Sequence, residues 1–383
     1  MMKMIAIFDY YLGGHHIEYI HHLYVGANLR KDIKFLFILP KSFDTYSKKI
    51  KWEYSENVEF VFFECSEKFI RGLGGFSKAK FLSKILNRYI RKYDIKNLIL
   101  VETMPFLPFL PFLVPRDLRI SSIIYNIARY REKPTLLVRC LDKLKYTLIS
   151  YFNCFKNVYL LNDKESPAFY NKKYSVNKFL YLPDPYFYVE AIDKIDFRRI
   201  HSININKKIL LHFGGLTKRK GTVDILDAII SNPNQIAEKY CFIFAGRVYD
   251  DIKDIFYQKI ALIKDKVQIL IFDDFCDYKF LGTLCQNSDF IIIPYHQASQ
   301  SSGIISYAAQ FHVPVIGPSN GLLGDIIRRY NLGILLPEIT PKSIAHCLSS
   351  KDLDGFKIDT NSMDKYLDEN SITQFIDTIY SNI

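Results

Sequence analysis

The sequence predicts an α/β protein made of two doubly wound, Rossmann-like domains in tandem. Short apolar runs alternate with helical patterns along the whole chain, which is typical of parallel sheets joined by crossover helices. A chain of 383 residues, 49% of them hydrophobic, is longer than one core usually organises. Residues 183–185, Pro-Asp-Pro, directly follow an apolar run, and this indicates a break between two units.

The predicted strands are short and rich in Ile, Leu, Val and Phe, as expected where helices cover both faces of a sheet. In the first half they span residues 4–8, 35–40, 58–63, 98–101, 120–125, 158–161 and 179–182. In the second half they span residues 209–213, 241–245, 267–272, 290–294, 314–317 and 333–336. The clearest helical patterns cover residues 16–29, 78–93, 135–152, 223–230 and 304–311. We place the first domain at residues 1–185, a linker at 186–206, the second domain at 207–360, and at 361–383 a helical tail that can pack back on the first domain.

Cysteine usage and the start of the chain favour a cytoplasmic protein. The seven cysteines form no CxxC pair, and most lie in apolar runs, which favours reduced, buried thiols. The first apolar run is too brief for a signal peptide, and no uninterrupted apolar stretch of about 18 residues predicts a transmembrane helix.

The positive charge is unevenly distributed. Residues 1–190 hold 30 Lys and Arg against 18 Asp and Glu, a net charge of +12, whereas the whole chain carries +11. An anionic partner should therefore meet the first half. The basic helical pattern at residues 78–92 and the proline-interrupted Phe and Leu residues of 104–112 favour an anionic membrane surface or a lipid-linked acceptor, at the inner face of a membrane. The alternative is a solvated surface helix. Nucleic acid is not expected, because no RRM, KH or zinc-finger pattern is present.

A glycine-rich basic turn follows the first strand of the second half. Gly214 and Gly215 let the backbone approach a ligand closely, and Lys218, Arg219 and Lys220 supply charge before the next helix. This pattern is typical of phosphate binding, although a solvated basic turn would look the same.

A second candidate for anion binding lies before the helical run at residues 304–311. Ser299, Ser301, Ser302 and Gly303 precede it, and serine hydroxyls and helix N-terminal amides both bind oxyanions. Ordinary N-capping by Ser301 or Ser302 is the alternative interpretation.

The order of these segments resembles the C-terminal domain of GT-B-fold glycosyltransferases, specifically the group 1 family (glycosyltransferase family 4). The segments that carry the resemblance are Gly214-Gly215 with Lys220-Gly221, Phe244-Ala245-Gly246, Val267 to Phe272, Ser288-Asp289-Phe290 with Pro294, Gly303 with Ala308 and Pro314-Val315-Ile316, Gly321 with Asp325, and Gly333 to Leu336. Before these, Pro183-Asp184-Pro185 resembles the family's interdomain junction, and Gly13-Gly14 its acceptor-side glycine loop. The resemblance implies two Rossmann-like domains that face each other across a cleft.

The resemblance also implies roles for residues of the second half. Lys220, with Arg219, would neutralise a donor diphosphate beside Gly214 and Gly215, and the amides near Ser302, Gly303 and Ile304 would hold the distal phosphate. The segment Phe272–Phe275 would receive the nucleobase through backbone groups and the rings of Phe272 and Phe275, and Gly246, Arg247 and Tyr307 would lie near the base and ribose. Family members generally use no metal, so we expect neither a metal nor a cofactor, and the nucleotide-diphospho-sugar is a substrate.

Three positions depart from the family. Two acidic residues that normally contact the donor sugar and the ribose are replaced by Ser299 and Tyr307, and Gly215 stands near the place of a usual arginine. Arg247 is a candidate to compensate. Neither Ser nor Tyr supplies a carboxylate, so the identity of the donor is less constrained than the fold.

Candidate residues of the first half follow its predicted strands. Gly13 and Gly14 are followed by His15 and His16, one of which we expect beside substrate, with a pKa suited to proton transfer. Glu102 and Asn126 end two further strands at the edge where α/β sheets bind ligands. We predict catalytic roles for His15 and Glu102, and contacts to donor sugar or acceptor from Gly13, Gly14, His16 and Asn126, with His296 and Ser299 from the second half.

Together these patterns predict a metal-independent, retaining glycosyltransferase that moves a sugar from a nucleotide-diphospho-sugar to a glycan or lipid-linked acceptor in surface polysaccharide synthesis. The alternative is a non-catalytic nucleotide-sugar-binding subunit of the same fold that partners an active transferase. A nicotinamide oxidoreductase is excluded, because no G-x-G-x-x-G follows a strand.

Overall fold

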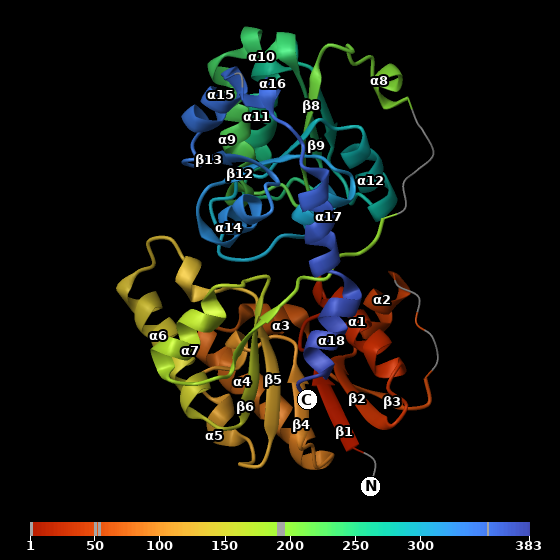
Figure 1. Cartoon of the computed structure of the whole chain (residues 1–383), viewed down its shortest axis with the longest axis vertical. Coiled ribbons are helices and arrows are strands. Elements are labelled where there is room, and N and C mark those ends of the chain that lie inside the picture. The colour runs from red at the N-terminus through yellow and green to blue at the C-terminus, as the bar shows by residue number, and fades with distance from the viewer. Residues whose placement is uncertain (1–2, 50–51, 53–54, 190–195, 351) are drawn as a thin grey trace. The chain divides into compact units, whose positions relative to one another are not determined.

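The computed structural model describes residues 3–49, 52, 55–189, 196–350 and 352–383. They form two compact α/β units, and each unit contains one parallel sheet (Figure 1). The first unit comprises Met1–Arg129, Lys133–Pro185 and Ser371–Ile383, and the second comprises Tyr130–Glu132 and Tyr186–Asn370, as far as these ranges are described. Of the predicted linker 186–206, residues 190–195 lie outside the described residues, and the remainder belongs to the second unit.

The sheet of the first unit has seven strands in the order β3-β2-β1-β4-β5-β6-β7, all parallel. The order runs outward from β1 in both directions, as in doubly wound folds, so ligands are expected at the carboxyl ends of the strands. The strands are β1 (Lys3–Phe8), β2 (Ile33–Pro40), β3 (Val58–Phe63), β4 (Asn97–Leu100), β5 (Arg119–Ile124), β6 (Phe155–Leu161) and β7 (Phe179–Leu182).

Helices pack around this sheet, and all but α18 lie between its strands in the sequence (Figure 1). They are α1 (His16–Asn28), α2 (Phe43–Tyr46), α3 (Glu67–Gly72), α4 (Gly75–Lys92), α5 (Leu110–Leu113), α6 (Leu136–Tyr151), α7 (Ser166–Tyr174) and α18 (Ile372–Tyr380), with single 3₁₀ turns η1 (Ser47–Lys49), η2 (Met104–Phe106) and η3 (Ala128–Tyr130).

The second unit repeats the plan with six parallel strands in the order β10-β9-β8-β11-β12-β13. The strands are β8 (Lys208–Phe213), β9 (Tyr240–Ala245), β10 (Ile269–Phe272), β11 (Phe290–Ile292), β12 (Val315–Pro318) and β13 (Gly333–Leu336). The helices are α8 (Phe197–Ile200), α9 (Thr222–Ser231), α10 (Pro233–Lys239), α11 (Lys253–Ile263), α12 (Tyr278–Gln286), α13 (Gly303–Gln310), α14 (Gly321–Arg329), α15 (Pro341–Ser349), α16 (Asp352–Gly355) and α17 (Thr360–Glu369), with the 3₁₀ turn η4 (Lys218–Lys220). The predicted fold class, two doubly wound parallel sheets, is confirmed.

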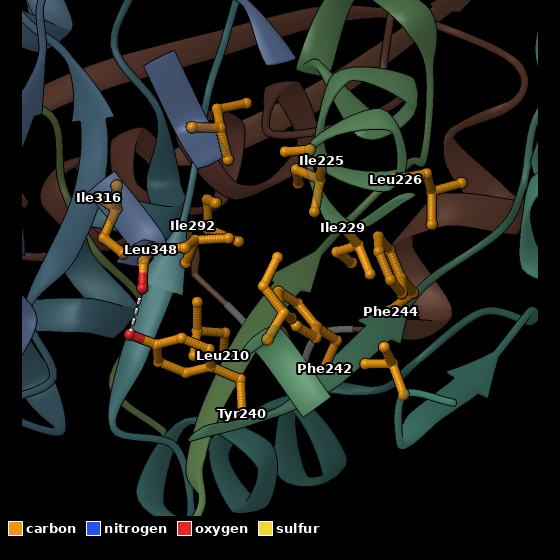
Figure 2. Packing of buried hydrophobic residues seen from close by; sticks show 14 of the residues in the cluster. Leu210, Ile225, Leu226, Ile229, Tyr240, Phe242, Phe244, Ile292, Ile316 and Leu348 are labelled. Carbon is orange, nitrogen blue, oxygen red and sulfur yellow. Dashed lines mark hydrogen bonds between the residues drawn. The ribbon is translucent and has the colours of Figure 1, made fainter. Parts of the chain in front are cut away.

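A continuous apolar core fixes the central strands of the second unit. Leu210, Phe242 and Phe244 from β8 and β9 pack against Ile225 and Ile229 of α9 (Figure 2). The hydroxyl of Tyr240 in this cluster has a partner, because it donates to the carbonyl oxygen of Leu348 at 2.9 Å (Figure 2). This packing holds rigid the strand ends that carry the loops described below.

The last helix, α18, belongs to the first unit, whereas α17 belongs to the second, so the predicted tail 361–383 is divided between them. Gly26 of α1 makes the packing of α18 possible, since a β-carbon there would lie 2.4 Å from Cε2 of Tyr380. The hydroxyl of Tyr380 also donates to the carbonyl oxygen of Leu23 at 2.6 Å. Helix α18 thus packs against α1, the helix that follows β1.

The apolar segment 104–112 differs from its predicted exposure. Phe106, Leu107 and Leu110 are buried, and Phe112 remains exposed. The turns η2 and α5 pack against α4, where the hydroxyl of Ser83 donates to the carbonyl oxygen of Phe106 at 2.9 Å. This segment therefore lies largely in the core, and Phe112 remains at the surface. Among the described residues, no helix is long and apolar enough to cross a membrane.

Candidate functional site

A buried histidine near the carboxyl end of β8 links three elements of the second unit. His212 of β8 lies with Nδ1 2.8 Å from the carbonyl oxygen of Ile292 and Nε2 2.9 Å from Oγ1 of Thr222. A carbonyl oxygen only accepts, so Nδ1 carries the proton and Nε2 accepts from the Thr222 hydroxyl. Burial lowers the pKa of His212 to about 4, and the ring is therefore neutral. One side chain thus joins β8, β11 and the first turn of α9.

The loops after β8, β9 and β11 approach one another at backbone distance. A β-carbon at Gly246, where φ is +122°, would lie 2.1 Å from the carbonyl oxygen of Gly214. A β-carbon at Gly221, where φ is +71°, would lie 2.2 Å from the carbonyl oxygen of Pro294. Both positions require glycine for their conformation and for the close approach. These loops lie at the carboxyl ends of the parallel strands, where this fold class binds ligands.

Lys220 folds back over the glycine turn. A β-carbon at Gly214 would lie 2.6 Å from Nζ of Lys220 and 3.9 Å from Cδ1 of Ile304. Nζ of Lys220 also lies 5.4 Å from the ring centroid of Tyr295, and Cζ of Arg219 lies 5.8 Å from the same ring. Two cations therefore share one aromatic ring beside the turn.

Helix α13 begins at this place. The N–H groups of Gly303 and Ile304 occupy its first turn and have no partner inside the helix, as at any helix start. Ser302 is the N-cap residue, but its side chain makes no capping bond, so the capping interpretation of its hydroxyl does not hold. Ser299 is buried and Ser301 is half-buried. Gly214, Lys220 and Ile304 come together, as the diphosphate hypothesis requires.

Residues predicted near the nucleobase and ribose lie along the neighbouring loops. Phe272 packs edge-on against Phe280 at 5.0 Å, whereas Phe275 is exposed on the loop after β10. Tyr307 packs edge-on against Phe213 at 5.5 Å, and Arg247 is exposed.

Other residues shape the same loops. A β-carbon at Gly215 would lie 2.9 Å from Cε2 of Tyr249, so Gly215 leaves room for that ring. His296 lies beside α9, with Nε2 2.8 Å from Oδ2 of Asp224, and its N–H donates to the carbonyl oxygen of Arg219 at 3.0 Å.

Asp273, which the sequence placed within the nucleobase segment Phe272–Phe275 without a role of its own, joins the loops after β9 and β10. Its carboxylate accepts the Val248 N–H at 2.7 Å and the Tyr257 hydroxyl at 2.6 Å. Burial works to raise the pKa of Asp273, but these hydrogen bonds and the nearby cations Lys253 and Arg247 lower it overall. Its position directly after Phe272 of β10 was the available signal.

Tyr295 was not predicted from the sequence. It is buried, and among the described residues its hydroxyl has no hydrogen-bond partner. A buried polar atom without a partner is unusual, and here it belongs to the ring that Lys220 and Arg219 both approach. Its place just beyond β11 was the available signal.

The first unit holds a separate polar cluster at the carboxyl ends of its strands. Oδ2 of Asp9, which directly follows β1, lies 2.8 Å from Nδ1 of His16, and Oδ1 accepts the Tyr11 N–H at 3.2 Å. Burial works to lower the pKa of His16, but the charge of Asp9 and its hydrogen bond outweigh burial and raise it. His15 instead lies exposed, with Nδ1 2.9 Å from Oε2 of Glu18. The structure thus places His16, and not His15, beside a buried carboxylate.

Glu102 belongs to the same cluster. The Tyr10 hydroxyl donates to its Oε2 at 2.8 Å, and Nζ of Lys78 lies 4.9 Å from the centroid of the Tyr10 ring. Burial raises the pKa of Glu102, and the charge of His16 and the bond from Tyr10 offset part of that rise. The buried hydroxyl of Tyr125 has no partner among the described residues, and its ring lies 5.3 Å from that of His16.

The glycines before α1 differ in their surroundings. A β-carbon at Gly13 would lie 2.2 Å from the hydroxyl oxygen of Tyr11, whereas one at Gly14, with φ of +61°, would meet nothing within 4 Å. Asn126 is half-buried two residues beyond the end of β5. No group of three His, Cys, Asp or Glu side chains among the described residues is placed to hold a metal ion.

Comparisons with known proteins found a curated relative and solved structures of similar fold. No protein-family model matches the chain. An uncharacterized glycosyltransferase of Methanocaldococcus jannaschii is 29% identical over 154 residues, which cover 40% of this chain and only 38% of that protein. The match therefore spans well under half the length of that relative.

Solved structures match over the whole chain. A glycosyltransferase from Rickettsia africae has a TM-score of 0.69 at 15% identity, covering 99% of this chain and 97% of that one. HepE of Anabaena, in complex with UDP, has a TM-score of 0.65 at 14% identity, covering 100% and 99%. An α,α-trehalose-phosphate synthase from Burkholderia vietnamiensis has a TM-score of 0.72 at 8% identity, covering 99% of each. At these identities the likeness shows the fold.

Proposed function

We propose that this chain is a glycosyltransferase that moves a sugar from a nucleotide-diphospho-sugar to a hydroxyl of a glycan or lipid-linked acceptor. The observation that carries the proposal is the meeting of Gly214, Nζ of Lys220 and the start of α13 at one edge of the second sheet. A glycine turn, a cation and a helix N-terminus together bind phosphate oxygens well. The curated relative and the solved neighbours support the same reaction class.

In this proposal the second unit stabilises the leaving diphosphate. Lys220 and Arg219 supply positive charge, and the N–H groups of Gly303 and Ile304 donate hydrogen bonds at the positive end of the α13 dipole. Charge that develops on the departing phosphate is thus met by groups already in place, and the step requires no metal. Retention of the anomeric configuration follows from the family resemblance.

We assign the nucleoside to the loops after β9 and β10. Asp273 fixes the backbone of Val248, and the exposed ring of Phe275 offers a face for a base. UDP is the first candidate, because a structural neighbour was solved with it.

The first unit would bind the acceptor. His16 and Glu102 offer an imidazole ring and a carboxyl group at the carboxyl ends of the strands, each with a raised pKa, and both can exchange hydrogen bonds with sugar hydroxyls. The open space at Gly14 leaves room for a ligand to approach the backbone. A lipid-linked acceptor agrees with the excess positive charge of residues 1–190.

A second candidate, a nucleotide-sugar-binding subunit without turnover, is favoured by one observation. Ser299 is buried and Tyr307 packs on Phe213, so neither position provides the carboxylate usual in the family. A melting-temperature screen with UDP-, GDP-, dTDP- and CMP-sugars, followed by assays of nucleotide release with lipid and glycan acceptors, separates the candidates. Turnover with any donor supports the transferase. A nucleotide that raises the melting temperature without turnover supports the subunit, and no binding by any nucleotide contradicts both.

A further inference from the structure

Helix α6 turns apolar residues outward. Leu136 and Leu137 are 77% and 69% exposed, and Cys140 and Leu144 are exposed as well. Residues 136, 140 and 144 are four positions apart and therefore share one side of the helix. Tyr151, 78% exposed, extends this side to the helix end. A surface helix usually packs its apolar side against the core. The exposure of this apolar side to solvent therefore indicates a function in binding.

The inward side of α6 is firmly attached. Tyr146 and Ile149 are buried, and Tyr146 stacks on Tyr170 of α7 with ring centroids 4.2 Å apart. The ammonium group of Lys178 donates to the carbonyl oxygens of Ser150 and Phe152, each at 2.8 Å, near the C-terminus of the helix. The helix is therefore fixed in its orientation, and its exposed leucines are a property of the folded unit.

Basic residues flank the exposed apolar side. Arg139 and Lys143 are exposed on α6, and neither forms an ion pair with a described residue. Lys133, just before the helix, is exposed too. These charges lie in the half of the chain that carries a net charge of +12. The combination of leucine, tyrosine and unpaired cations is complementary to an anionic interface.

The apolar surface continues beyond α6. Phe152 follows Tyr151, and their rings lie 5.4 Å apart. The ring of Phe152 in turn lies 4.9 Å from that of Phe112 in α5, which is 66% exposed. Two neighbouring helices thus contribute aromatic side chains to one surface.

We propose that this surface, defined as Leu136, Leu137, Cys140, Leu144, Tyr151 and Phe112 with Arg139 and Lys143, docks the protein on an anionic phospholipid bilayer. The apolar side chains enter the interface between headgroups and acyl chains, and the two cations contact lipid phosphates. The surface differs from the basic helix α4, whose apolar residues Ala79, Leu82 and Leu86 are buried. Among the described residues, the large apolar side chain that α4 exposes is Phe76, in its first turn, whereas α6 exposes Leu136, Leu137, Leu144 and Tyr151 along its length. The inference does not depend on the donor site of the second unit.

Flotation of the full-length protein with vesicles tests the proposal. The wild type should bind vesicles of equimolar phosphatidylglycerol and phosphatidylcholine and not vesicles of phosphatidylcholine alone. Arg139→Gln with Lys143→Gln should lower the partition coefficient about 25-fold, about fivefold for each charge. The double variant Leu137→Ser with Leu144→Ser should lower the partition coefficient by more than the charge variant does. The protein should stay folded, because both side chains are exposed. Lys80→Gln with Lys84→Gln on α4 is the control of equal charge and should change binding little.

A second measurement reports insertion directly. The tryptophan introduced by Leu137→Trp should emit at shorter wavelength when the protein binds anionic vesicles. Lipids with brominated acyl chains should quench its fluorescence. Leu262→Trp, at a leucine 67% exposed on α11, is the matched control and should not respond. The proposal is overturned if the wild type fails to bind anionic vesicles, or if the α4 control loses as much binding as the α6 charge variant. It is also overturned if the protein binds no vesicles and forms a dimer that dissociates in Leu137→Ser, because the α6 leucines would then be a dimer interface. The affinity of these variants for nucleotide should equal that of the wild type. A failure of the membrane proposal would therefore not contradict the proposed glycosyltransferase reaction.

Discussion

Asp9 and His16 form a hydrogen-bonded pair of 2.8 Å at the end of the first strand, and the Asp9 side chain is fully buried. The pair joins the residue that directly follows β1 to the first residue of α1, so local chain geometry brings the two together. Because Asp9 stabilises the protonated ring, the pKa of His16 lies above its ordinary value in the folded protein. The charge state of this cluster should therefore depend on pH.

The first prediction concerns that pH dependence. A raised folded-state pKa contributes stability that is fully present below the unfolded pKa and is lost as pH rises through the folded pKa. His16→Gln should accordingly lower the free energy of unfolding more at pH 6 than at pH 9, as measured by urea denaturation. His15→Gln, at the exposed neighbour, is the control and should have little effect at either pH. Equal losses at both pH values would show that the ionic pair contributes nothing.

A second prediction concerns His212, whose pKa is lowered to about 4. The unfolded chain binds the proton more readily, so this group should reduce stability as pH falls below about 6.5. His212→Leu should remove that pH dependence. It should also cost about 1–3 kcal/mol at neutral pH, because the Thr222 hydroxyl and the Ile292 carbonyl lose a buried partner. Thermal unfolding between pH 4.5 and 7.5 measures both effects, and an unchanged stability would contradict the role given to this ring.

A third prediction concerns the packing of α18 on α1. Gly26→Ala should destabilise the protein by about 1–3 kcal/mol through overpacking against Tyr380, although alanine favours helix by about 1 kcal/mol. Gly72→Ala, in another helix with open space around it, is the control and should be neutral or mildly stabilising. Protection of α18 in hydrogen exchange should fall in Gly26→Ala alone. Unaltered protection would mean that α18 does not pack closely on Gly26.

The fold could be predicted from the sequence because alternation of apolar runs and helical patterns determines a parallel sheet. Each predicted strand corresponds to an observed one, with shifts at the ends such as β10, which begins at Ile269 and not at 267. Periodicity could not give the exposure of 104–112, because Phe106 and Leu110 are buried by α4, a partner remote in sequence. For the same reason α6 did not stand out as a surface, since its helical pattern leaves open which side packs.

The two loops of the predicted donor site could be found from glycine spacing and charge. The first unit was harder, because adjacent histidines point in directions about 100° apart on a helix, and only the helix start decides which one faces inward. The structure begins α1 at His16, which turns His16 toward Asp9 and His15 toward solvent. Asp9 and Tyr125 follow strands just as Glu102 does, so the rule that selected Glu102 would also have selected them.

The central claim is that Lys220 binds the diphosphate of the donor, and calorimetric titration of the nucleoside diphosphate identified by the melting screen tests it most directly. Lys220→Ala should weaken binding about 10- to 100-fold, because about 1.5–3 kcal/mol is lost with a charged hydrogen bond. Its melting temperature should stay close to that of the wild type. Lys218→Ala, which removes an exposed lysine from the same turn, should bind as the wild type does. Equal affinity of Lys220→Ala and Lys218→Ala for the nucleotide would contradict the account.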